Sequence, residues 1–116
     1  MENLKNKMSR KSVPEKVRRI TETIFACKWS FTILTVVQNG TVRPGAICRC
    51  IEGLSPKVMN HCLGKLVDFS ILQKKAYPEI PPRVEYLFTA FGLRFMGIFD
   101  LLDELSHELA EDEPGP

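Results

Sequence analysis

The sequence contains few of the residues from which enzymes build reactive centres. Its two histidines, His61 and His107, fall in separate predicted helices. No nucleophile–base spacing and no phosphate-binding glycine loop accompanies them. We therefore expect no catalytic site and no enzyme activity.

Long hydrophobic runs are also missing. No apolar stretch is long enough to cross a bilayer, and the polar, basic N-terminus lacks a signal-peptide core. These absences predict a cytoplasmic protein with no membrane partner. In that reducing compartment the four cysteines (Cys27, Cys48, Cys50 and Cys62) are expected to be thiols. With 116 residues, 44% of them hydrophobic and 26% charged, the chain is predicted to fold as one globular domain.

The cysteines do not show the spacing of a metal site. Cys48 and Cys50 are two positions apart on a predicted helix, so their side chains point roughly 200° away from each other. His61 and Cys62 are adjacent and face different sides of their helix. We expect no metal and no cofactor.

Two of the thiols are candidates for a redox switch. Cys27 lies beside Lys28 at a helix start, where the lysine and the helix amides favour thiolate. Cys48 lies in the first helix of a predicted helix-turn-helix. The alternative, that these are buried or idle thiols, stays open, as does the identity of any small-molecule or redox effector.

Charge is distributed unevenly along the chain. Residues 1–19 contain seven Lys or Arg against two acids, whereas Asp100 onward contains seven acids and no Lys or Arg. Because the whole chain carries a net charge of +2, the part before Asp100 carries +9. A basic body with an acidic tail suits a polyanionic partner that binds away from the C-terminus.

The first two thirds of the sequence has helical periodicity. Helices are predicted from near Pro14-Glu15, from Lys28-Trp29 to Asn39-Gly40, over Ala46–Ile51 and over Pro56–Phe69. Thr41-Val42-Arg43 could form one short strand. The tight turn at Glu52-Gly53-Leu54 between the last two helices gives helix-turn-helix connectivity.

The helix from Pro56 has two chemically distinct faces. Ser55 can cap its first turn, and Pro56 suits the first helical position. One face is apolar, formed by Val58, Met59, Cys62, Leu63, Leu66 and Phe69. The other carries Lys57, Asn60, His61, Gly64, Lys65 and Asp68. The polar face suits a helix presented to DNA bases and phosphates, although an ordinary amphipathic surface helix would show the same pattern.

Beyond Phe69 the pattern becomes extended. Candidate strands cover Ile71–Tyr77 and Arg83–Phe88, and in the second Val84, Tyr86 and Phe88 alternate inward. Pro78, Pro81 and Pro82 stiffen the connection between them. This predicts a mainly α protein with a small β-wing, a winged helix-turn-helix, in which Lys74, Lys75 and Arg83 can reach phosphates.

A last helix is predicted from a Thr89 cap to about Leu109. Its apolar stripe is broader than a small winged domain can cover, which predicts dimerisation through the terminal helices. The expected dimer contacts are Phe95, Ile98, Phe99, Leu102 and Leu105.

One stretch carries a family resemblance. Tyr77 to Tyr86, YPEIPPRVEY, followed by Thr89 and Gly92, resembles the wing signature of HxlR-type winged helix-turn-helix regulators, relatives of the MarR group in bacteria and archaea. Lys28-Trp29, Ile33-Leu34 and Gly53-Leu54-Ser55 fit earlier family positions in order. The resemblance implies a homodimer that binds double-stranded operator DNA with the helix from Pro56 and the wing.

The chain departs from this family pattern at four positions. Pro44 stands where the family usually has Phe, Gly64 where a basic residue is frequent, and Ser70 where glycine is usual. Lys16 occupies the position of the cysteine with which many members sense oxidants, so that sensor is not transferred.

The resulting hypothesis is a nucleoid-associated transcriptional regulator that reads an inverted repeat with helix 56–69 and wing 71–88. Lys57, Asn60 and His61 are expected at base edges, and the remaining candidates at phosphates or in the helix-start and wing geometry: Ser55, Pro56, Lys65, Lys74, Lys75 and Arg83. The expected organisation is a flexible basic arm (1–12), the winged domain (13–110) and a disordered acidic tail (111–116). The alternative is a winged helix used for protein contacts without DNA.

Overall fold

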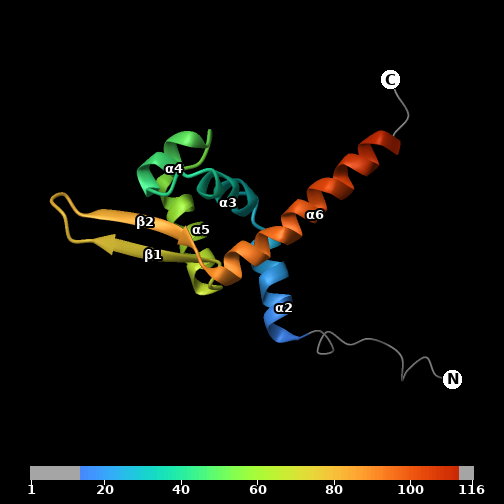
Figure 1. Cartoon of the computed structure of the whole chain (residues 1–116), viewed down its shortest axis with the longest axis horizontal. Helices are drawn as coiled ribbons and strands as arrows, with labels where there is room; N and C mark the ends of the chain where they lie inside the picture. The colour runs from blue at the N-terminus through green and yellow to red at the C-terminus, as the bar shows by residue number, and fades with distance from the viewer. Residues whose placement is uncertain (1–13, 113–116) are drawn as a thin grey trace.

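The structure, a computed structural model, describes residues 14–112. A group of short helices forms the body, a two-stranded wing extends from one side, and a long C-terminal helix projects from the other (Figure 1). In chain order the elements are α2 (Glu15–Ile20), the π-helical segment η2 (Thr21–Phe25), α3 (Ser30–Gln38), α4 (Pro44–Cys50), α5 (Pro56–Asp68), β1 (Leu72–Tyr77), β2 (Arg83–Phe88) and α6 (Ala90–Asp112). This is the mainly helical architecture with a β-wing that the sequence predicts.

The helix-turn-helix forms from α4 and α5. Pro44 occupies the first helical position of α4, so this helix begins two residues earlier than predicted. The turn contains Gly53 with a φ of +85°, a conformation that costs glycine nothing because it has no Cβ atom. Ser55 then caps α5, since its Oγ accepts a hydrogen bond from the Val58 amide at 3.2 Å.

The wing is a two-stranded antiparallel sheet. Leu72 pairs with Phe88 at its base, and Tyr77 pairs with Arg83 next to the proline-rich tip. The short strand considered at residues 41–43 does not form. Instead, one backbone hydrogen bond from the Tyr86 amide to the Val42 carbonyl (2.9 Å) ties β2 to the α3–α4 connection.

Helix α6 is fixed to the body at its first turn. Thr89 Oγ1 accepts a hydrogen bond from the Gly92 amide at 2.8 Å, which confirms the predicted cap. The helix continues to Asp112, two residues into the expected tail, while residues 1–13 and 113–116 lie outside the described part of the chain. The predicted N-terminal arm and most of the acidic tail therefore fall outside it.

The core lies between α5 and the elements around it. On α5 the side chains of Met59, Cys62, Leu63 and Leu66 are buried, as its apolar face predicts. Val58 was placed on the same face but is 39% exposed, because it lies in the first turn, at the edge of that face. The other contributions come from neighbouring elements: Ile24, Ile33, Leu34, Val37, Ile47, Ile51, Leu54, Ile71, Leu72, Tyr86, Phe95, Met96 and Phe99.

No single helix within residues 14–112 combines the length and apolar content that a membrane span needs. One pair, Glu15–Phe25 with Ser30–Gln38, reaches that threshold together but is bent by 86°.

Candidate nucleic-acid interface

The polar face of α5 is open to solvent. Lys57, Asn60, His61 and Lys65 are all exposed, as are Ser55 and Pro56 at the helix start. Gly64 lies among them, and a Cβ atom at this position would have no neighbour within 4 Å. The opposite face is buried in the core, so packing fixes the helix while its polar side chains point to solvent.

The base of the wing lies beside this helix face. Asn60 and Gly64 of α5, Lys74 of β1 and Tyr86 of β2 line one open hollow of about 470 Å³. Lys74 therefore approaches the predicted base-reading surface, although 14 positions of sequence separate Lys74 from Asn60. The hollow is thus lined by a cation, by an amide that can both donate and accept hydrogen bonds, and by the Asp68 carboxylate.

The outer part of the wing is organised around Tyr77. The Arg83 guanidinium lies 4.0 Å from the centre of the Tyr77 ring, and the Lys75 amine lies 5.3 Å from it. The Tyr77 hydroxyl in turn donates a hydrogen bond to Glu85 Oε1 at 3.1 Å. Lys75 remains exposed on the strand.

Arg83 is held by its own neighbours. Its guanidinium lies 3.2 Å from Glu79 Oε2 and 3.7 Å from Glu85 Oε2, and its side chain is 29% exposed. Two carboxylates already compensate this charge, so Arg83 is better placed to fix the wing-tip geometry than to bind a phosphate.

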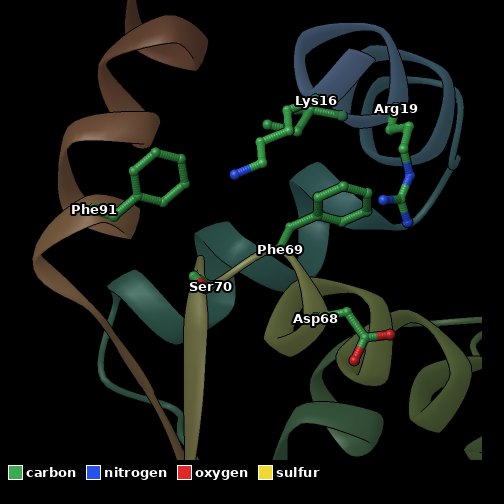
Figure 2. A pocket seen from close by; sticks show the side chains of 7 residues that line it. Lys16, Arg19, Asp68, Phe69, Ser70 and Phe91 are labelled. Atoms are coloured by element: carbon green, nitrogen blue, oxygen red, sulfur yellow. The ribbon is translucent and has the colours of Figure 1, made fainter.

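A second hollow, of about 380 Å³, lies at the C-terminal end of α5. It is lined by Lys16 and Arg19 of α2, by Phe69 and Ser70 after α5, and by Phe91 of α6. In Figure 2 the Lys16 amine extends toward the space between the Phe69 and Phe91 rings, and the Asp68 carboxylate is directed away from it. Arg19 lies over the Phe69 ring, 5.6 Å from its centre. The C-terminal end of α5 thus meets α2 and α6 at this point.

The predicted dimer residues separate into two groups. Phe95 and Phe99 are 5% and 6% exposed and pack with Phe25 and Phe31 in an aromatic cluster; the Phe31–Phe99 centroids lie 4.7 Å apart. Ile98, Leu102 and Leu105 are between 44% and 47% exposed. Other large apolar side chains are also exposed, although they are not among the dimer contacts predicted from the sequence: Val17, Phe25, Phe31, Phe91, Leu93, Leu101 and Leu109.

Among the cysteines, the structure joins two that the sequence did not pair. Cys27 and Cys62 have their Sγ atoms 3.3 Å apart. Cys48 donates a hydrogen bond to the Leu54 carbonyl at 3.3 Å, and Cys50 is exposed. Within residues 14–112, no three His, Cys, Asp or Glu side chains gather as metal ligands would.

The two paired thiols ionise differently. Burial opposes ionisation of Cys27, but hydrogen bonds from the Ser30 hydroxyl, the Trp29 and Ser30 amides and the Cys62 thiol outweigh it and lower its pKa. Burial, reinforced by the neighbouring Cys27, raises the pKa of Cys62 to about 12. At neutral pH, Cys27 is therefore the thiol of the pair that more readily becomes a thiolate.

Helix-turn-helix connectivity, an exposed polar second helix and a β-wing beside it define a winged helix-turn-helix protein. A family model described as "HxlR-like helix-turn-helix" matches residues 24–114. The chain belongs to this family of transcriptional regulators, which is not a class of enzymes. The resemblance seen in the sequence is confirmed.

Individual relatives agree with this assignment. An uncharacterized HTH-type transcriptional regulator of Synechocystis is 34% identical over 86 residues, covering 74% of this chain and 64% of the relative's own length. The solved structure of a MarR-family regulator from Porphyromonas gingivalis is 35% identical, with a TM-score of 0.69 over 89% of this chain and 98% of that one. The reduced form of the redox regulator HypR shares the fold, with a TM-score of 0.68, 24% identity, and coverage of 83% of this chain and 93% of that one.

Proposed function

We propose that this protein binds double-stranded operator DNA as a homodimer and regulates transcription in the cytoplasm, at the nucleoid. The observation that carries the proposal is the exposed polar face of α5 with Lys74 of the wing beside it. A helix that presents Lys57, Asn60 and His61 has the size and chemistry to enter a major groove. Asn can pair bidentately with adenine, and Lys can reach the acceptors of guanine.

The wing and the ends of α5 supply contacts of another kind. Lys65 of α5 and Lys74 and Lys75 of the wing are exposed cations, and we assign them to backbone phosphates. Because Lys74 and Lys75 are consecutive in β1, they lie on opposite faces of the wing. Arg83 fixes the wing tip through Tyr77, Glu79 and Glu85. This division predicts that binding combines a sequence-dependent part from α5 with a salt-dependent part from the lysines.

The arrangement of half-sites in the operator follows from the proposed homodimer. Two recognition helices related by a dimer axis enter successive major grooves about 34–36 Å apart. The preferred site is therefore an inverted repeat whose half-sites lie about one helical turn, or a multiple of it, apart. Selection of binding sites from a random DNA library with the full chain should enrich such a repeat.

Two alanine variants should separate the two kinds of contact. We expect Asn60→Ala to cost about 1–3 kcal/mol on the selected site and little on random DNA, because it removes a base contact. Lys75→Ala should weaken both alike and reduce the slope of log affinity against log salt by about one unit. Fluorescence anisotropy across a salt series measures both quantities.

Gln73→Ala is the matched control, since Gln73 is exposed on the same strand and carries no charge. It should leave the affinity and the salt slope unchanged. If Asn60→Ala and Lys75→Ala behave identically on selected and random DNA, the proposal that α5 reads the bases is wrong. A wild-type chain with no salt-dependent DNA binding would instead favour a winged helix used for protein contacts.

Thiol oxidation is the modulation that we propose for this regulator. Cys27 is the reactive centre, because its pKa is lowered and its side chain is only partly buried. Cys48 is less suited to this role, since its thiol is bound to the Leu54 carbonyl.

A further inference from the structure

Cys27 and Cys62 connect the recognition helix to the start of α3. Cys27 lies in the short connection between η2 and α3, and Cys62 lies in the middle of α5 on its buried face. They are 35 positions apart in sequence, yet their Sγ atoms are separated by only 3.3 Å. The contact therefore joins the DNA-reading element to a different part of the fold.

The two thiols differ in access as well as in acidity. Cys27 is partly exposed, so a small oxidant can reach it from solvent, whereas Cys62 is 3% exposed. Ser30, itself 2% exposed, hydrogen-bonds the Cys27 sulfur from the first residue of α3. A reachable, hydrogen-bonded sulfur with a second thiol in contact has the arrangement of an attacking and a resolving cysteine.

We propose that Cys27 and Cys62 are a dithiol that hydrogen peroxide or an organic hydroperoxide oxidises to an intramolecular disulfide. The modification site stands on the contact between the two sulfurs. Its effect on DNA binding rests on the proposed function. This disulfide does not involve Cys48. It also does not link two copies of the chain, because both sulfurs belong to one protomer.

The reaction balances in two steps. The Cys27 thiolate attacks one peroxide oxygen and the O–O bond breaks, which leaves a sulfenic acid and a hydroxide (or an alkoxide, from an organic hydroperoxide). The hydroxide or alkoxide takes up the proton that the Cys27 thiol released and leaves as water or alcohol. The Cys62 sulfur then attacks the sulfenic sulfur and forms the S–S bond, while the sulfenic hydroxyl leaves with the Cys62 proton as water. The two thiols lose two electrons in total, and the peroxide gains them.

Closing this bond requires movement within the core. A disulfide holds its sulfurs about 2.05 Å apart, so the two atoms must approach by roughly 1.2 Å. Cys62 is adjacent to Leu63 on α5, a side chain with no exposed surface, and a close-packed core transmits such a shift to neighbouring elements. We therefore expect α5 to move relative to α3, displacing Lys57, Asn60 and His61 from their places in the groove. Operator affinity should fall by about tenfold or more.

The first test is chemical and does not depend on DNA. The reduced full-length chain is treated with hydrogen peroxide, alkylated, digested without reductant and mapped by mass spectrometry. We expect a Cys27–Cys62 cross-linked peptide pair, a protein that still migrates as a single chain without reductant, and full reversal by dithiothreitol. A linkage between two chains, or Cys27 oxidised to sulfinic acid while Cys62 stays a free thiol, would overturn the proposal.

Cysteine variants provide the controls. Cys27→Ser and Cys62→Ala should each abolish the cross-link, whereas Cys48→Ser and Cys50→Ser should retain it. Because Cys62 is buried, circular dichroism must first show that Cys62→Ala folds; if it does not, Cys27→Ser alone decides the role of the attacking thiol. A cross-link that survives in Cys27→Ser contradicts the assignment.

The pH dependence gives a further readout. Because the hydrogen bonds to Cys27 lower its pKa, the thiolate is populated at lower pH than in an ordinary cysteine. The rate of iodoacetamide labelling at Cys27 should therefore reach half its maximum below the pH of a free cysteine peptide. An equal or higher midpoint would remove Cys27 as the attacking thiol.

DNA binding is measured separately on reduced and oxidised protein. A tenfold loss that dithiothreitol reverses, and that Cys27→Ser lacks, supports the regulatory effect. If the cross-link forms but the affinity for DNA is unchanged, the proposed regulatory effect is wrong, whereas the proposed disulfide site is supported. If the reduced protein binds no DNA, the proposed function fails, while the peptide map still decides the dithiol.

Discussion

Replacing Ile98 and Leu102 together by glutamate is expected to give a folded monomer whose operator affinity is lower by about 100-fold or more. Both side chains are exposed on α6, at 44% and 47%, and they lie on the same side of the helix as Leu105 and Leu109. Glutamates on this stripe would place like charges at a twofold interface, where each contact is repeated by symmetry. The monomer would then lose the second half-site, which a dimer occupies at high effective concentration.

The choice of positions follows from the structure. Phe99 was predicted at the interface, but its ring stacks on Phe25 and Phe31 within the protomer, with centroids 5.2 Å and 4.7 Å away. Changing it would disturb the core together with any interface. Ile98→Glu/Leu102→Glu replaces none of the rings of the aromatic cluster, and circular dichroism checks that the variant folds.

Leu93→Glu is the matched control. Leu93 is 60% exposed on the same helix but points to the side opposite Leu102. Sedimentation velocity and operator titration should show a dimer with unchanged affinity for this variant. A wild-type chain that is already monomeric at micromolar concentration would contradict dimerisation through α6.

Gly92→Ala is expected to destabilise the fold by about 3 kcal/mol or more, because the new methyl group would overlap the backbone of another segment. A Cβ atom at this position would lie 1.9 Å from the carbonyl oxygen of Ile71 and 2.8 Å from its carbon. Backbone atoms cannot swing away as a side-chain end can. The same Ile71 carbonyl accepts a hydrogen bond from the Thr89 amide at 3.2 Å. Moving this carbonyl to relieve the overlap would therefore also weaken the hydrogen bond at the start of α6.

Gly97→Ala serves as the matched control on the same helix. No atom lies within 4 Å of a Cβ at Gly97, so alanine should stabilise α6 by up to about 1 kcal/mol through helix propensity. Urea unfolding followed by circular dichroism measures both variants. Equal unfolding free energies for the two would show that Ile71 and α6 are not packed as described.

Most of the fold could be predicted because its signals are local. The Ser55 cap, the Pro56 start and the apolar spacing of α5 act within a few residues of one another, and each is observed. The alternation of Val84, Tyr86 and Phe88 likewise placed β2 correctly. The boundaries of α4 and α6 were less accurate, because neighbouring turns extend a helix by a residue or two without a strong sequence signal.

The sequence by itself determined the class of this protein: the order of helices and strands, the polar face of α5 and the apolar stripe of α6 are all periodic patterns. Only the tertiary structure decided which members of those patterns face the core and which face solvent. It buried Phe95 and Phe99 while leaving Ile98 and Leu102 exposed, neutralised Arg83 between two carboxylates, and brought Cys27 against Cys62. Each of these outcomes depends on contacts between segments far apart in the chain. Periodicity assigns a side chain to a face of its own helix or strand, but only packing determines what lies opposite that face.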